Sequence, residues 1–120
     1  MDIRLNDSEL KVMNVLWRQD ETLARDVAAE LTGVFGWNAN TTYTLIKRLV
    51  KKGAVERREP GFACRALVSK EQVQRIETDS LIEKLYDGSV DKLFAALLGG
   101  RRASPEEIRH LREMIDAYEE

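Results

Sequence analysis

Residues 38–53 read NANTTYTLIKRLVKKG, and this stretch decides the fold that the sequence predicts. A helix is expected to begin near Asn38 or Asn40 and to end at Gly53, a natural helix C-cap. At about 100° per residue, one face holds the residues expected in the core, Thr42, Leu45, Ile46 and Leu49. The opposite face holds Asn40, Thr44, Lys47, Arg48 and Lys51. Small hydrogen-bonding groups followed by cations suit a helix that meets base edges first and phosphates further along.

A basic β-hairpin is expected directly after this helix. Residues 54–58 (AVERR) and 62–68 (FACRALV) have the length and composition of short strands, and a Pro-Gly turn at 59–61 joins them. The hairpin carries Arg57, Arg58 and Arg65.

Two helices are expected before residue 38. The first begins at Asn6, where residues 6–9 (NDSE) fit a capping box, and it fades near residues 19–20. The second follows Thr22, and Gly33 and Gly36 end it. Three helices followed by a two-stranded hairpin are the order of a winged helix. We therefore expect a mainly helical chain with a winged-helix DNA-binding domain over residues 1–68.

Three further helices are expected in residues 69–120. A second capping box at 69–72 (SKEQ) begins a helix that reaches about Tyr86, a second helix covers 90–98, and a third follows Ser104-Pro105. Three amphipathic helices cannot bury their apolar stripes alone, whereas two copies packed together can. We therefore expect a helical dimerisation domain over 69–120, with its interface formed by Ile82, Leu85, Leu93, Phe94, Leu97, Leu111 and Ile115.

The charge distribution singles out the same central region. The formal net charge is −2, but residues 41–68 carry seven Lys/Arg and two Asp/Glu, a net +5 inside an otherwise acidic chain. Such a block is typical of an anion-binding surface. Charge alone is equally consistent with a solvated face.

Composition excludes several classes of protein. With 120 residues, 43% of them apolar and 33% charged, the chain fits one globular domain or a small domain with an assembly appendage. No apolar signal core or membrane-spanning run is present, so a cytoplasmic protein without membrane insertion is expected. Cys64 is the single cysteine, which excludes an intrachain disulfide and a multi-cysteine metal site. No nucleophile, histidine and acid form a catalytic pattern, so no enzyme, metal or cofactor is expected.

Several single residues have a structural and a functional interpretation. Cys64 is expected to pack in a strand rather than act as a redox switch, and His110 to be solvated rather than a metal or pH switch. Trp17 and Trp37 are expected in core contacts rather than a ligand cage. Residues 99–102 (GGRR) are expected to form a loop, with a protease-sensitive hinge as the alternative.

Three stretches carry a resemblance to a known family. Residues 10–17 (LKVMNVLW) look like the first helix of the penicillinase and methicillin-resistance repressors, the BlaI/MecI/CopY family. Residues 41–53 (TTYTLIKRLVKKG) resemble its recognition helix, and residues 85–89 (LYDGS) the link before its dimer helices. The resemblance implies a dimeric repressor that binds an inverted-repeat operator in double-stranded DNA.

The resemblance also implies roles for individual residues. Carried over by position, the residues that would face DNA are Thr41, Thr44, Lys47 and Arg48, with Arg57 and Arg65 helping on the wing. Arg48 has a second interpretation, a partly structural bridge to a nearby acid. A winged helix that binds an acidic protein instead of DNA is the alternative function.

The chain departs from the family in its dimer domain. Resistance-type members lose activity when a membrane-bound sensor protease pathway leads to cleavage at an Asn-Phe bond, and this chain has Ala96-Leu97 at the corresponding positions. Proteolysis, a ligand and a partner therefore stay open as the inducing event. The copper-responsive branch carries a C-terminal cysteine cluster that this chain lacks, so copper sensing is not expected. In the wing, Phe62 and Cys64 stand where the family often has two aromatic residues.

Overall fold

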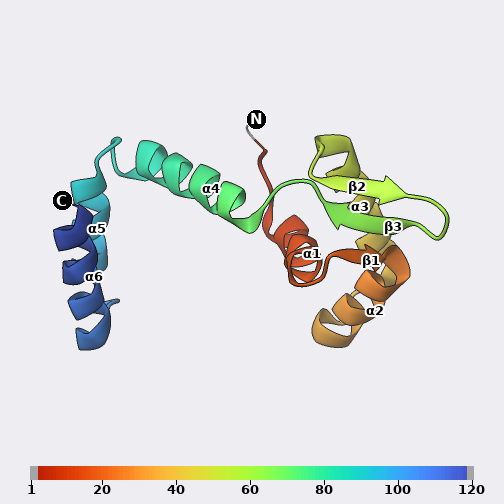
Figure 1. Ribbon diagram of the computed structural model, residues 1–120, viewed down its shortest axis with the longest axis horizontal. Coiled ribbons are helices and arrows are strands. Elements are labelled where there is room, and N and C mark those ends of the chain that lie inside the picture. The colour runs from red at the N-terminus through yellow and green to blue at the C-terminus, as the bar shows by residue number, and fades with distance from the viewer. Residues whose placement is uncertain (1–2, 119–120) are drawn as a thin grey trace. The chain divides into compact units, whose positions relative to one another are not determined.

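The computed structural model describes residues 3–118 as six helices and a small antiparallel sheet (Figure 1). In chain order the elements are α1 Asp7–Arg18, β1 Glu21–Leu23, α2 Ala24–Phe35, α3 Ala39–Lys52, β2 Val55–Arg58, β3 Ala63–Ala66, α4 Lys70–Leu85, α5 Val90–Gly99 and α6 Pro105–Tyr118. The two expected domains include four terminal residues that lie outside the described residues: Met1, Asp2, Glu119 and Glu120. The element order confirms the predicted winged helix followed by further helices.

Three helices begin at capping boxes, two of them predicted as such from the sequence and the third at the predicted helix start after Ser104. The Asn6 side chain accepts a hydrogen bond from the Glu9 backbone N–H at 2.8 Å, and the Asn6 N–H donates to Glu9 Oε1 at 2.9 Å. The same reciprocal pair is present at residues 69–72 and at residues 104–107. Each box pairs two backbone N–H groups that a helix start otherwise leaves without a partner.

The sheet has three strands, one more than the hairpin expected from the sequence. β1 pairs with β3 and β3 with β2, all antiparallel, so that β3 is central. Thr22 and Arg57 lie on either side of Cys64 in this register. The additional strand has three residues, too few to show the alternation by which a strand is predicted. Cys64 lies on the face of β3 that packs into the hydrophobic core and is fully buried, whereas the next residue, Arg65, is exposed on the opposite face.

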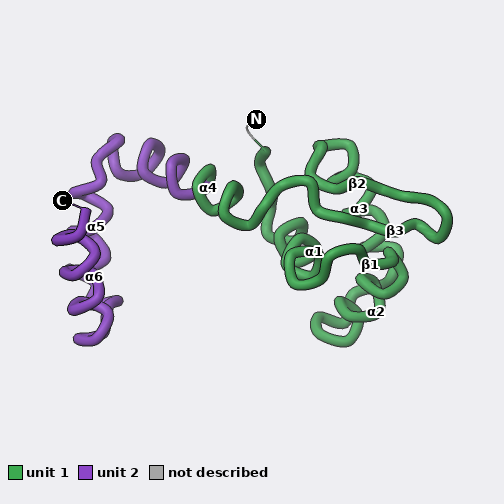
Figure 2. Tube along the Cα trace, in the orientation of Figure 1, with its two compact units in different colours: residues 1–76 green, residues 77–120 purple. Residues whose placement is uncertain are grey.

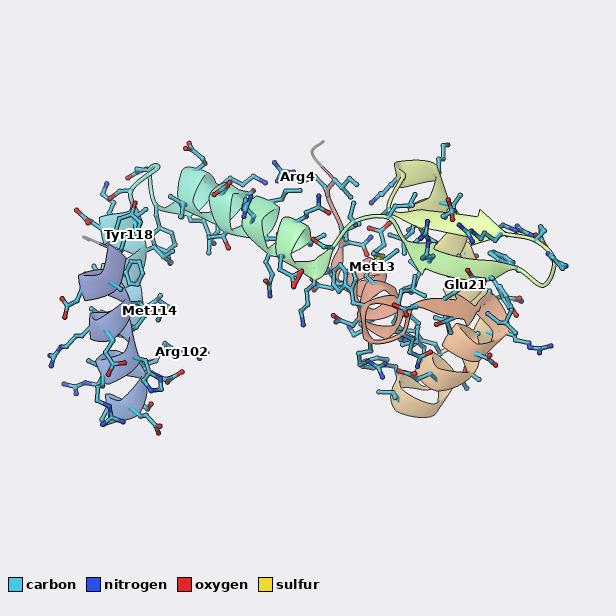
Figure 3. The ribbon with its side chains drawn as sticks, viewed as in Figure 1. Arg4, Met13, Glu21, Arg102, Met114 and Tyr118 are labelled. Carbon is cyan, nitrogen blue, oxygen red and sulfur yellow. The ribbon has the colours of Figure 1, made fainter. Side chains whose placement is uncertain are left out.

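The core lies between the first three helices and the sheet. Figure 3 labels Met13 of α1 there, and its side chain is fully buried. The predicted inner face of α3 is buried throughout: Thr42, Leu45, Ile46 and Leu49. Trp17 and Trp37 pack against this core, and Trp17 Nε1 donates to the Val68 carbonyl at 2.9 Å. Both tryptophans therefore make the core contacts that the structural interpretation expects.

The chain divides into two compact units, residues 1–76 and residues 77–120 (Figure 2). Val73 of α4 is buried in the core of the first unit, which therefore extends beyond residue 68. In the second unit, none of the described residues is buried. No helix within residues 3–118 combines the length and the apolar character needed to cross a membrane.

Candidate nucleic-acid interface

One face of α3 is polar and open to solvent. The helix begins after Asn38, whose side chain accepts from the Asn40 N–H at 2.8 Å, and it ends at Gly53, where φ is 84°. This left-handed conformation favours glycine, as the sequence predicts. The residues predicted to face DNA are exposed along the helix: Asn40, Thr41, Thr44, Lys47, Arg48 and Lys51.

The cations on this face have no carboxylate partner. In the part of the chain that the structure describes, no ion pair or side-chain hydrogen bond engages Lys47, Arg48 or Lys51. The structural interpretation of Arg48 requires a bridge to a nearby acid, and no carboxylate among the described residues pairs with Arg48. Three unpaired cations on one helix face keep their full charge available to an anion.

Lys52, the next residue along, has a different environment. Its Nζ donates to Glu9 Oε1 at 2.7 Å and to the Arg4 carbonyl at 2.9 Å. The Glu9 side chain is 0% exposed and that of Lys52 is 36% exposed. This pair ties the end of α3 to the start of α1. The sequence predicts only a capping role for Glu9 and none for Lys52, because no local pattern connects residues that far apart.

The outer face of the sheet carries a network of paired charges. Glu56 Oε1 accepts from Arg58 Nε at 2.7 Å and from Arg65 Nη2 at 3.3 Å, and Arg58 Nη1 lies 3.7 Å from Glu21 Oε2. Figure 3 labels Glu21 on β1. The hydrogen bond from Arg58 is the largest effect that holds the pKa of Glu56 below its usual value. Arg65, predicted to help bind DNA, is therefore engaged by a carboxylate.

Phe62 joins the tip of the wing to the helices. Its ring centroid lies 6.1 Å from that of Tyr43 on α3, and its carbonyl accepts from the Ala24 N–H at 2.9 Å. The guanidinium carbon of Arg57 lies 3.7 Å from the Phe62 centroid, a cation–π contact. Arg57 Nε also donates to Glu59 Oε1 at 2.7 Å, and this bond lowers the pKa of Glu59. Arg57 is thus exposed but not free, and these contacts set the position of the wing against α3.

Cys64 has the environment of a packing residue. Burial raises the pKa of its thiol to about 11, so the thiol stays protonated at neutral pH. We expect iodoacetamide at pH 7.5 to leave Cys64 unmodified in the native protein and to alkylate it in urea, as read by mass spectrometry. Rapid alkylation of the native protein would contradict the packing interpretation. His110 is exposed on α6, as expected for a solvated side chain.

The sequence is similar to known repressors along nearly its whole length. The family model described as penicillinase repressor matches residues 5–117. The chain is 26% identical over 117 residues to the penicillinase repressor of Bacillus licheniformis, which covers 96% of this chain and 91% of that protein. It is 27% identical over 114 residues to the methicillin resistance regulatory protein MecI of Staphylococcus aureus (strain N315), with 93% of each chain covered.

Two solved structures are each similar to more than half of the chain. The solution structure of the DNA-binding domain of the repressor BlaI matches with a TM-score of 0.55 and 29% identity, over 58% of this chain and 88% of that one. The monomeric form of Bacillus licheniformis BlaI in complex with the blaP half-operator matches with a TM-score of 0.53 and 29% identity, over 59% and 89%.

Proposed function

The chain belongs to the penicillinase repressor family, whose members are DNA-binding repressors rather than enzymes, and from this premise we propose that it represses transcription as a homodimer on an inverted-repeat operator. The membership confirms the resemblance inferred from residues 10–17 and 41–53. The observation that carries the proposal is the exposed, unpaired polar face of α3. A two-fold symmetric dimer presents this face twice, which matches two half-sites of opposite orientation. A repressor acts where its DNA is, so the cytoplasm is its proposed location.

Within this face, the order of side chains assigns their roles. Asn40, Thr41 and Thr44 occupy the first half of α3, and short hydroxyl, methyl and amide groups fit base edges in the major groove. Lys47, Arg48 and Lys51 follow, with the reach and charge to hold phosphates. The similar structure of monomeric Bacillus licheniformis BlaI is a complex with a half-operator, which supports DNA as the partner of this domain.

The second unit is the proposed dimerisation domain. Leu85 is 69% and Ile115 53% exposed, and Figure 3 labels Met114 and Tyr118, also exposed, on α6. Phe94 and Leu97 are exposed too, whereas Ile82, Leu93 and Leu111 are half-buried. A groove of about 440 Å³ runs between α5 and α6, lined mainly by apolar side chains. Exposed apolar side chains gathered on neighbouring helices in this way are typical of an interface rather than of a free monomer.

Derepression by cleavage stays one proposed route, through the sensor protease pathway that the family resemblance implies. Ala96 and Leu97 are exposed but lie within α5, not in a loop. Because a helical peptide bond must unwind to enter a protease, cleavage there requires local unfolding of α5.

Two substitutions on α3 test the proposed function. Lys47→Ala is expected to weaken binding to operator and scrambled DNA alike and to reduce the salt slope of the dimer by about two, because it removes one phosphate contact from each subunit. Thr44→Ala is expected to reduce the preference for operator over scrambled DNA, because it removes a base contact. Fluorescence anisotropy on a fragment of the protein's own promoter, at several salt concentrations, measures both.

Equal losses on both DNAs for Thr44→Ala would reject its assigned role. The wild-type protein is expected to prefer operator DNA by orders of magnitude and to lose affinity steeply as salt rises. A protein that shows neither property is instead a winged-helix protein-interaction module.

A further inference from the structure

The cations of the DNA-binding unit fall into two groups. Those on the outer face of α3 are unpaired within the described residues, whereas the wing arginines are held by glutamates of the sheet and of the turn after β2. Glu21, Arg65 and Glu56 lie opposite one another across β1, β3 and β2. Arg58 is two residues from Glu56 and therefore shares its face. The charges of two positive and two negative side chains thus cancel on this surface.

This network has little to contribute to the stability of the fold. Arg58 is 54%, Arg65 45% and Glu56 36% exposed, and solvent screens ion pairs at such positions. The network has a larger effect on the binding of a second anion, such as a DNA phosphate. An arginine that moves to a DNA phosphate must leave Glu56, or bring the phosphate close to a carboxylate, and both oppose binding.

We propose that Glu56 restrains the sequence-independent part of DNA affinity by competing with phosphates for Arg58 and Arg65. The inference rests on the proposed function and concerns what limits it. Sequence-independent affinity comes essentially from phosphate contacts. A wing whose arginines are already paired therefore adds little affinity for DNA of arbitrary sequence. Discrimination between operator and other DNA then depends on the base contacts of α3.

Glu56→Gln tests this inference by removing the competing charge while keeping the size of the side chain. We expect affinity for scrambled DNA to rise about eight-fold at 0.1 M salt for each arginine released, since a phosphate contact has a salt slope of about −0.9. The slope itself should steepen by one to two contacts per subunit, which is two to four for the dimer. The thermal midpoint should stay unchanged, which separates this role from a structural one.

Two controls isolate the release of the arginines. Glu30→Gln also removes a glutamate paired with an arginine, Arg18, but on the α1–α2 face, and it should leave binding unchanged. In the background Glu56→Gln, the further changes Arg58→Gln and Arg65→Gln should abolish the gain. A gain that survives them would show simple loss of repulsion and overturn the inference.

The outcomes separate this inference from the proposed function. If the wild-type protein prefers operator DNA but Glu56→Gln leaves affinity and salt slope on scrambled DNA unchanged, the role of Glu56 alone is rejected. If the wild-type protein binds neither DNA, the proposed function fails and the role of Glu56 fails with it.

Discussion

Ile115→Glu is expected to convert the dimer into monomers and to lower affinity for a two-half-site operator by about 10²–10⁴-fold, the usual gain from linking two binding events. In a two-fold interface each substitution occurs twice, so two carboxylates would be placed in an apolar surface. Ile115 is 53% exposed in the subunit, so the fold of one subunit does not depend on it. Sedimentation gives the mass, and anisotropy gives affinity for the full operator and for a single half-site.

Affinity for the single half-site should stay unchanged, because α3 and the wing are untouched. Arg109→Gln is the matched control, since it makes the same change of one negative unit on the side of α6 opposite its apolar stripe. It should leave both mass and affinity as they are. A dimer of Ile115→Glu at micromolar concentration would contradict the assignment of the interface.

The parts of the fold that the sequence predicts are those set by neighbouring residues. The capping box at Asn6 and the C-cap at Gly53 depend on residues within a few positions, and both are present. The inner face of α3 follows from helical periodicity alone. β1 was missed because its three residues form a strand only through pairing with β3, which lies far along the chain.

The same distinction explains what the sequence shows of the site. Periodicity places the polar side of α3 toward solvent, but counting charge treats all seven cations of residues 41–68 as equal. The structure separates unpaired Lys47, Arg48 and Lys51 from paired Lys52, Arg57, Arg58 and Arg65. Which cation meets a carboxylate depends on how distant segments pack, and no local pattern contains that information.

Lys52→Met is expected to lower the free energy of unfolding by about 2–3 kcal/mol. Removing one partner of a buried ion pair leaves an uncompensated charge, although the exposure of Lys52 reduces the effect below that of a fully buried pair. Without Nζ, Glu9 Oε1 retains only the Asn6 N–H among the hydrogen bonds recorded for it, and Oε2 has no partner in the described structure. Urea denaturation measures the loss.

Lys51→Met provides the matched control one residue away. Its side chain is exposed and unpaired within the described residues, so stability should change by less than about 0.5 kcal/mol while DNA affinity and salt slope fall. Lys52→Met should show the reverse, and adding Glu9→Gln should restore part of its stability because a neutral amide needs no cation. Equal stability losses for the two lysine variants would contradict this division of roles between Lys51 and Lys52. The expected, unequal losses would mean that adjacent lysines of α3 serve different ends: Lys51 holds DNA, and Lys52 holds the helix that presents it.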